Sequence, residues 1–350
     1  MLGEPVLITG AAGFIGMHVA RRLLSEGHDV VGIDNLNAYY DPTLKAARVA
    51  ELEAFPNFRF ERIDIADRES VAESFAVHRF SHVVHLAAQA GVRHSLVDPY
   101  AYADANLTGF LNVLEGCRHT GCRHLVYASS SSVYGANTRV PFRVSDNVDH
   151  PLSLYGASKK ANELMAHAYA HLFALPATGL RFFTVYGPWG RPDMAMWLFT
   201  DAIMQGRPIK LFNQGRMRRD FTYIDDVVEA VVRLVSRPPA PNPAWSGDAP
   251  DPATSRAPWR VYNIGNSRPV EVTEVVRLIE QAVGKPAVRE LLPMQPGDVP
   301  ETSADATDLE QAVGFRPKTP IGEGVRRFID WFLQFRQSDG PEPPAMRGGL

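Results

Sequence analysis

Short apolar segments alternate with longer amphipathic segments through the first half of the chain. The apolar runs predict buried strands at residues 6–9, 29–33, 58–62, 82–87, 124–129 and 177–185. Apolar positions with helical spacing predict helices at residues 14–26, 44–54, 71–77, 100–119 and 155–173. Buried strands joined by helices are typical of a doubly wound, Rossmann-type parallel sheet.

The second half of the chain is less regular. A strand is expected at 261–264, and helices at 273–283 and 322–335. We expect a Rossmann domain at 1–187, to which 222–265 return, and a smaller C-terminal α/β region for the substrate at 188–221 and 266–336. Residues 238–258 are rich in Pro, Ala, Ser and Asp, which predicts a surface insertion, and 337–350 are expected to be a disordered tail.

Composition narrows the class of protein. The chain has 350 residues, 45% of them hydrophobic, and a net charge of −3, so no basic field indicates a nucleic-acid partner. Its two cysteines, Cys117 and Cys122, indicate neither a disulfide framework nor a zinc site, and no other metal site is expected. No signal sequence or membrane-spanning apolar stretch is visible, so a cytoplasmic protein is predicted.

A glycine-rich turn joins the first strand to the first helix. Its sequence, Gly10-Ala-Ala-Gly13-Phe14-Ile15-Gly16, suits a tight turn that brings backbone N–H groups to a pyrophosphate at a helix N-terminus. Asp34, at the end of the second strand, would bond ribose hydroxyls and repel a 2′-phosphate, which favours NAD over NADP. A turn aspartate before Asn35 is the simpler alternative.

Two further strand ends carry residues suited to the same cofactor. Asp64 and Ile65 would meet the adenine ring, although Asp64 could instead cap the next helix. Small residues in Ala87-Ala88-Gln89 would let the cofactor pass close to the backbone. The expected cofactor contacts are therefore Gly10, Gly13, Phe14, Ile15, Gly16, Asp34, Asn35, Asp64, Ile65, Ala87, Ala88, Gln89, Tyr155 and Lys159.

Tyr155 and Lys159 stand four residues apart at the start of a predicted helix, and so share one face. A nearby ammonium group favours the phenolate and lowers the pKa of a tyrosine, which makes it a better base. A serine run at 129–132 ends the preceding strand, and a serine hydroxyl there could hold the substrate oxygen. This arrangement suits proton transfer at a sugar or alcohol oxygen while a hydride moves.

Taken together, the motifs resemble the extended short-chain dehydrogenase/reductase family over about residues 6–335. The segment 219–226, Arg-Asp-Phe-Thr-Tyr-Ile-Asp-Asp, resembles a signature of its nucleotide-sugar members. The segments 91–93, 181–188 and 190–195, the last reading Gly-Arg-Pro-Asp-Met-Ala, are similar to those of UDP-glucuronate 4-epimerases. The resemblance implies an NAD-dependent isomerase that converts UDP-glucuronate to UDP-galacturonate through a 4-keto sugar.

The resemblance also implies roles for particular residues. Tyr155 would be the acid/base, Lys159 would bind the nicotinamide ribose and tune Tyr155, and Ser130 would position the sugar O4. The residues expected around the sugar carboxylate are Ser131, Ser132, Thr184 and Arg191. Arg219 would meet the diphosphate, and Arg93 and Asp298 complete the expected substrate contacts; a solvated surface position is the alternative for Arg191 and Arg219. Pairing through the helices at 100–119 and 155–173 would give a homodimer.

Three other functions stay open. Decarboxylases of the same sugar nucleotide typically carry Glu where Ser132 stands. Epimerases of neutral UDP-hexoses usually have Asn where Thr184 stands, and often an arginine where Gln295 lies. An NAD-dependent sensor on the same fold would be outside catalysis altogether, but it would not need Ser130, Tyr155 and Lys159 together.

Overall fold

The computed structural model describes residues 4–295 and 298–337, which are built around a seven-stranded sheet. All of its strands run parallel, in the order β11-β6-β5-β4-β1-β2-β3. They are β1 (Val6–Thr9), β2 (Val30–Ile33), β3 (Phe58–Glu61), β4 (His82–His85), β5 (His124–Ser130), β6 (Ala177–Phe182) and β11 (Trp259–Ile264). Chain order reverses beside β1, which is where such sheets open a binding crevice. The predicted Rossmann-type fold is confirmed.

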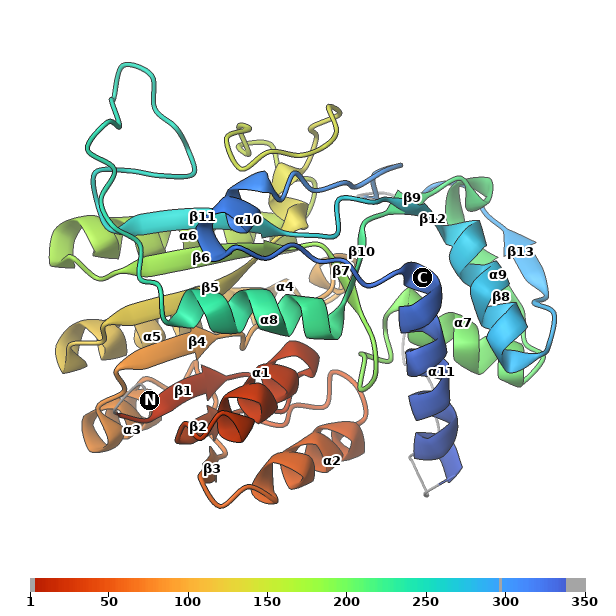
Figure 1. The fold of residues 1–350 in the computed structure, drawn as a ribbon, viewed down its shortest axis with the longest axis horizontal. Coiled ribbons are helices and arrows are strands. Elements are labelled where there is room, and N and C mark those ends of the chain that lie inside the picture. Colours follow the sequence, from red (N-terminus) through yellow and green to blue (C-terminus); the bar gives the residue numbers. More distant parts are fainter. Residues whose placement is uncertain (1–3, 296–297, 338–350) are drawn as a thin grey trace.

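Helices cover both faces of this sheet (Figure 1). One layer consists of α1 (Phe14–Ser25), α2 (Pro42–Glu53) and α8 (Ile224–Val235), and the other of α3 (Arg68–His78), α5 (Gly109–Thr120) and α6 (Leu154–Phe173). Within β1, Val6 and Ile8 join the core under the first layer and Leu7 joins the core under the second. Burial on both faces explains why the strands read as unbroken apolar runs.

A smaller region lies beyond the carboxyl ends of the strands (Figure 1). In it α7 (Ala195–Met204) packs on α9 (Val272–Val283), which packs on α11 (Ile321–Gln337). Trp189, Trp197 and Trp331 form an aromatic cluster there. Short strands pair as β7 (Thr184–Tyr186) with β10 (Phe221–Tyr223), β9 (Arg218–Arg219) with β12 (Val270–Glu271), and β8 (Ile209–Leu211) with β13 (Arg289–Leu291).

Two predicted elements are divided in the structure. The strand expected at 177–185 ends at Phe182, and β7 leaves the main sheet to pair with β10. The helix expected at 100–119 is α4 (Pro99–Tyr102), a π-helix (Ala103–Thr108) and α5. In the π-helix the carbonyl of Asn106 accepts a hydrogen bond from Asn162 Nδ2 of α6 at 2.6 Å, so a tertiary contact competes with the helical pattern.

Several elements were not predicted at all, namely α7, α8, α10 (Thr307–Val313) and the short paired strands other than β7. The segment 238–258 has neither helix nor strand and projects away from the sheet, although Ala253 and Thr254 near its end are buried (Figure 1). Across 4–295 and 298–337, none of the helices is both long and apolar enough to cross a membrane. The predicted tail at 337–350 lies outside the described residues from 338 onward.

Candidate active site

A cavity of about 450 Å³ opens at the carboxyl ends of β1, β4 and β5. Of the residues predicted for the site, it is lined by Gly10, Gly13, Phe14, Ile15, Gly16, Asp34, Asn35, Asp64, Ile65, Ala87, Ala88, Gln89, Ser130, Ser131, Ser132, Tyr155, Lys159, Thr184, Arg191, Arg219 and Asp298. Arg93 does not line it, but Arg93 Nη2 pairs with Asp298 Oδ2 at 3.0 Å. Segments more than 200 residues apart in sequence therefore meet around one space.

The glycine turn is closed so tightly that side chains would not fit. Gly10 has φ +73°, and a Cβ there would lie 2.7 Å from the backbone nitrogen of Ala87. A Cβ on Gly16 would collide with the carbonyl oxygen of Gly10. No side chain of the described residues caps the start of α1 at Gly13. The N–H groups of the first turn thus face the cavity region as an anion site.

Acidic and amide groups line the cavity beyond this turn. Asp34 Oδ1 accepts a hydrogen bond from the backbone of Leu36 at 2.9 Å, and Asn35 Nδ2 donates to Asp64 Oδ2 at 2.9 Å. Helix α3 is capped by Asp67, so the alternative role of Asp64 as its cap is wrong. Sequence reasoning missed Lys45, which lies in α2 with its Nζ 3.9 Å from Asp34 Oδ1.

The chain that follows β4 is held by groups from β1 and the π-helix. The backbone N–H of Ala87 donates to Thr9 Oγ1 at 3.2 Å, and that of Gln89 donates to Asn106 Oδ1 at 2.8 Å. Asn106 Nδ2 in turn donates to Ser158 Oγ at 2.9 Å, on the helix that carries Tyr155. The π-helix therefore fixes the chain past Ala87 relative to α6, a connection that the helical pattern gave no sign of.

Tyr155 and Lys159 lie on α6, which begins at a Ser153 cap. Lys159 Nζ donates to the carbonyl of Ala128 at 3.0 Å, and burial lowers the pKa of Lys159 to about 8. Burial raises the pKa of Tyr155, while a hydrogen bond from Ser130 and the charge of Arg191 lower it and the charge of Asp193 raises it. We expected Lys159 to lower the pKa of Tyr155; instead burial of the phenol has the largest effect and raises this pKa, and the cation that opposes it is Arg191.

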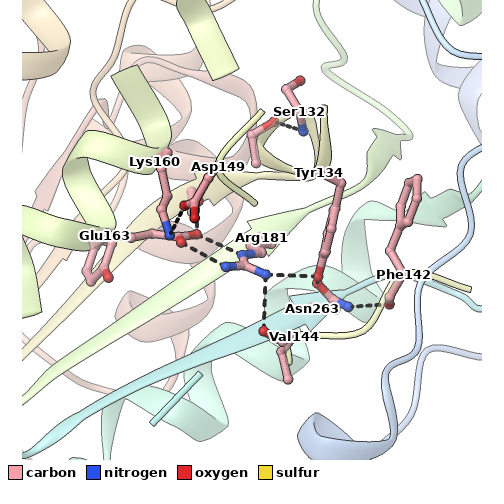
Figure 2. A network of polar contacts seen from close by, with 12 residues as sticks. Ser132, Tyr134, Phe142, Val144, Asp149, Lys160, Glu163, Arg181 and Asn263 are labelled. Atoms are coloured by element: carbon pink, nitrogen blue, oxygen red, sulfur yellow. Dashed lines mark hydrogen bonds and ion pairs between the residues drawn. The ribbon is translucent and has the colours of Figure 1, made fainter. Parts of the chain in front are cut away.

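A buried ion pair supports the serine run (Figure 2). Glu163 Oε1, two turns after Tyr155 on α6, accepts hydrogen bonds from Ser129 Oγ at 2.6 Å and from Arg181 Nε at 2.8 Å, and Glu163 Oε2 accepts from Arg181 Nη2 at 2.8 Å. Arg181 Nη1 donates to the Tyr134 hydroxyl, which donates to Asn263 Oδ1 at 2.6 Å. This Glu163–Arg181 network joins α6, β5, β6 and β11 behind the cavity wall.

Breaking this network should cost stability. In Glu163→Gln the shape is kept but Arg181, which has no exposed surface, loses its charge partner. We expect the free energy of unfolding to fall by about 3–5 kcal/mol, the usual effect of leaving one buried charge unpaired. Urea denaturation would measure it, with Glu274→Gln as the matched control, since the Glu274–Arg277 pair is exposed and should contribute nothing measurable.

The pH dependence offers a second check on the same pair. Burial raises the pKa of Glu163, but the charge of Arg181 and the hydrogen bonds from Arg181 and Ser129 together outweigh it and hold this pKa below its usual value of 4.5. The stabilisation is therefore fully present above pH 4.5 and is lost as the pH falls through the lowered pKa of the folded state. A Glu163→Gln variant with wild-type stability at neutral pH and the same acid sensitivity would contradict a structural role for the network.

The residues expected to contact the sugar carboxylate line the same cavity as Tyr155. Thr184 begins β7, and its N–H donates to the carbonyl of Asp220 at 3.1 Å. Arg191 is not a solvated surface residue: its Nε donates to Asp193 Oδ1 at 2.9 Å and its Nη2 donates to Asp193 Oδ2. The hydroxyl of Tyr39 donates to Asp193 Oδ2 at 3.1 Å. Neither Tyr39 nor Asp193 was predicted as part of the site.

Positive groups gather at a third part of the site. Arg219 lines the cavity and donates through Nη1 to the carbonyls of Arg218 and Pro300. Burial lowers the pKa of Arg219, the charge of Asp298 raises it and that of Arg93 lowers it. The guanidinium of Arg93 also lies 4.5 Å over the ring of Phe212. Asp298 thus pairs with Arg93, and its charge also acts on Arg219, at a point suited to binding a diphosphate.

Comparisons with known proteins agree with this geometry. A family model described as the NAD dependent epimerase/dehydratase family matches residues 6–246. A "Probable UDP-glucuronate 4-epimerase" of Rhizobium meliloti is 51% identical over 329 residues, which are 94% of this chain and 96% of that protein. The crystal structure of UDP-glucuronic acid 4-epimerase from Bacillus cereus in complex with UDP-glucuronic acid and NAD is 31% identical, with a TM-score of 0.82 over 95% of this chain and 99% of that chain.

A second solved structure shows that proteins with this fold bind different nucleotide sugars. UDP-glucose 4-epimerase of Thermotoga maritima, in complex with UDP-glucose, is 28% identical, also with a TM-score of 0.82, over 95% of this chain and 99% of that chain. The family model alone covers well over half of the residues. The resemblance inferred from the motifs is confirmed, and the chain belongs to the NAD dependent epimerase/dehydratase family.

Proposed function

We propose that this protein interconverts UDP-glucuronate and UDP-galacturonate at C4, using NAD. The observation that carries the proposal is that Tyr155, beside Ser130 and Lys159, lines the same cavity as Arg191 and Thr184. A base for O4 and donors for a C5 carboxylate thus lie within reach of one sugar. The names of the Rhizobium meliloti and Bacillus cereus relatives support the same reaction.

The residues around the glycine turn fit NAD. The turn excludes any Cβ at Gly10 and Gly16, so a pyrophosphate can approach the N-terminus of α1. Asp34, at the end of β2, would hold the adenine ribose, with Lys45 beside it. When bound, NAD supplies a hydride acceptor for C4 and a positive ring charge. Preference for NAD over NADP stays a prediction that rests on the carboxylate of Asp34.

The side chains can carry out the proton transfers. Tyr155 takes the proton from O4 as the C4–H bond breaks, leaving a 4-keto sugar. Ser130, which hydrogen-bonds Tyr155, positions O4, and Lys159 holds the ribose side of the cofactor. After the keto sugar turns over in the cavity, the hydride would return from the reduced cofactor to the opposite face of C4, and Tyr155 would return the proton to O4. The reaction has no net change in redox state.

The substrate carboxylate creates a hazard. A 4-keto sugar with a carboxylate on C5 is a β-keto acid, which loses CO₂ easily. Charge-assisted hydrogen bonds hold a carboxylate firmly in one geometry. Ser131, Ser132, Thr184 and Arg191 line the cavity and would hold it where cleavage of the C5–carboxylate bond is disfavoured.

The two alternative enzymes, a UDP-glucuronate decarboxylase and a 4-epimerase of neutral UDP-hexoses, typically differ from this chain at a few positions. Ser132 is where decarboxylases typically have Glu, and Thr184 is where neutral-hexose epimerases usually have Asn. The arginine often found where Gln295 stands is missing, but Arg93, held by Asp298, brings a second guanidinium toward Arg219. We propose that Arg219 and Arg93 bind the diphosphate together.

A direct assay separates these functions. Purified protein is incubated with UDP-glucuronate without added reductant, and nucleotide sugars and CO₂ are followed. UDP-galacturonate without CO₂ is expected. UDP-pentose with CO₂ would make the protein a decarboxylase, and turnover of UDP-glucose alone would make it a neutral-hexose epimerase.

A homodimer through α5 and α6 is part of the proposal. These two helices pack together and leave several apolar side chains exposed, among them Leu111, Leu164 and Leu172. We expect Leu164→Glu, at a side chain that is 59% exposed, to convert a dimer to a monomer in light scattering. Val288→Glu is the matched control, because Val288 is 54% exposed just before β13, away from α5 and α6, and should leave the mass unchanged. A monomeric wild type would contradict the dimer.

A cytoplasmic location and the division into domains also remain proposals. Cys117 and Cys122 are both buried free thiols, as expected in a reducing compartment. β11 and α8 place residues of 222–265 in and on the main sheet, which supports assigning that stretch to the Rossmann domain. Arg256 is exposed and no residue of 238–258 lines the cavity, which supports treating this segment as an insertion outside the site.

A further inference from the structure

Only one edge of the planar Arg191 guanidinium, the edge formed by Nε and Nη2, is bonded to a carboxylate. Its Nε and Nη2 are bonded to the carboxylate of Asp193. Among residues 4–295 and 298–337, Nη1 has no carboxylate partner, although the Tyr39 hydroxyl, which donates to Asp193, also interacts with the Arg191 guanidinium. Arginine presents five N–H donors in a planar fork, so the second edge remains free to bind another carboxylate. Arg191 lines the cavity, whereas Asp193 does not.

Asp193 is itself fixed from the cofactor side of the protein. The Tyr39 hydroxyl donates to Asp193 Oδ2, and the Tyr39 ring packs 4.8 Å from the ring of His94. Tyr39 follows β2 and lines the cavity. The ion pair between Arg191 and Asp193 raises the pKa of the Arg191 guanidinium and lowers the pKa of the Asp193 carboxyl, so both groups stay charged near neutral pH.

The loop that carries Arg191 is anchored independently. Arg48 of α2, which is fully buried, donates to the carbonyls of Trp189 and Gly190 through Nη2, and His18 of α1 bonds the carbonyl of Pro188 at 2.9 Å. Three successive carbonyls are thus tied to the Rossmann helices. The chain leading to Arg191 is therefore anchored to α1 and α2, and the Asp193 carboxylate orients the Arg191 side chain.

We propose that Asp193, held by Tyr39, is the positioning residue that presents the free edge of Arg191 to the carboxylate of the sugar, so that the preference for a uronate over a neutral hexose depends on Asp193. The inference rests on the proposed function and refines it. Loss of Asp193 would leave Arg191 charged but free to turn, which weakens a bidentate contact far more than it weakens simple attraction.

The test compares Asp193→Asn, which removes the charge and keeps the shape, with wild type. We expect KM for UDP-glucuronate to rise by about 10- to 100-fold, the range for a misplaced binding group, while the Kd of UDP-glucose in calorimetry stays unchanged. Tyr39→Phe should show a smaller rise with the same selectivity. Asp248→Asn, on the projecting 238–258 loop, removes the same charge away from the cavity and should change neither constant.

The pH profile gives a readout that structural damage would not produce. The charge of Asp193 raises the pKa of Tyr155, so its removal should move the acidic limb of the kcat profile to lower pH. Tyr39→Phe changes no charge and should leave that limb in place.

The possible outcomes are distinct. Equal weakening of UDP-glucuronate and UDP-glucose, with no movement of the acidic limb, would reduce Asp193 to a structural residue. A lower KM for UDP-glucuronate in Asp193→Asn would show that Asp193 competes with the sugar, and it would also overturn the inference. A wild type that never converts UDP-glucuronate would instead overturn the proposed function on which the inference rests.

Discussion

Replacing Tyr155 with phenylalanine should reduce epimerisation by about 10²- to 10⁴-fold, the usual contribution of a positioned acid/base. The ring still fills its place against Tyr102, 6.1 Å away between centroids, but no group remains to take the O4 proton. The Kd of UDP-glucuronate should change little, because the carboxylate and diphosphate contacts remain. Product formation and calorimetric binding would measure the two quantities separately.

Tyr169→Phe is the matched control for this experiment. Tyr169 lies on the same helix, but its hydroxyl donates to Glu115 at 2.6 Å and it does not line the cavity. We expect full activity from it. If Tyr155→Phe retained wild-type turnover, another group would have to be the base, and the proton-transfer scheme built on Ser130 and Lys159 would fail with it.

Replacing Arg191 with alanine should change the product as well as the rate. The substrate carboxylate loses a charged donor, worth about 1.5–3 kcal/mol for such hydrogen bonds, which corresponds to a fall of roughly 10- to 150-fold in kcat/KM. The keto sugar that still forms would be held less firmly, so we expect released CO₂ and UDP-pentose. Both are measured by chromatography and CO₂ trapping.

Arg191→Lys separates charge from geometry. Lysine keeps the positive charge but lacks the planar fork that binds Asp193 on one edge and leaves the other free. It should bind UDP-glucuronate better than the alanine variant and still release CO₂. Arg256→Ala, on the projecting loop, is the control. Unaltered turnover and products in Arg191→Ala would remove the carboxylate role of Arg191.

The sequence by itself determined the main sheet and the cofactor half of the site. The apolar runs of β1, β2, β4 and β5 are buried on both faces, so their pattern needs no knowledge of partners. Glycine at 10 suits the positive φ of a local turn, glycine at 13 and 16 avoids the carbonyl of Gly10 in the same turn, and Tyr155 and Lys159 share a helix face because of their spacing. Such local constraints can be inferred from neighbours in sequence.

Tertiary structure decided which groups act on one another. Sequence spacing pointed to Lys159 as the charge beside Tyr155, but the folded chain places Arg191 and Asp193 there as well and buries the phenol enough to raise its pKa. The Tyr39 hydroxyl donates to Asp193, 154 residues away in sequence, and the Asn106 carbonyl of the π-helix accepts a hydrogen bond from Asn162. Desolvation and long-range hydrogen bonds depend on packing between distant segments, and no local pattern in the chain records them.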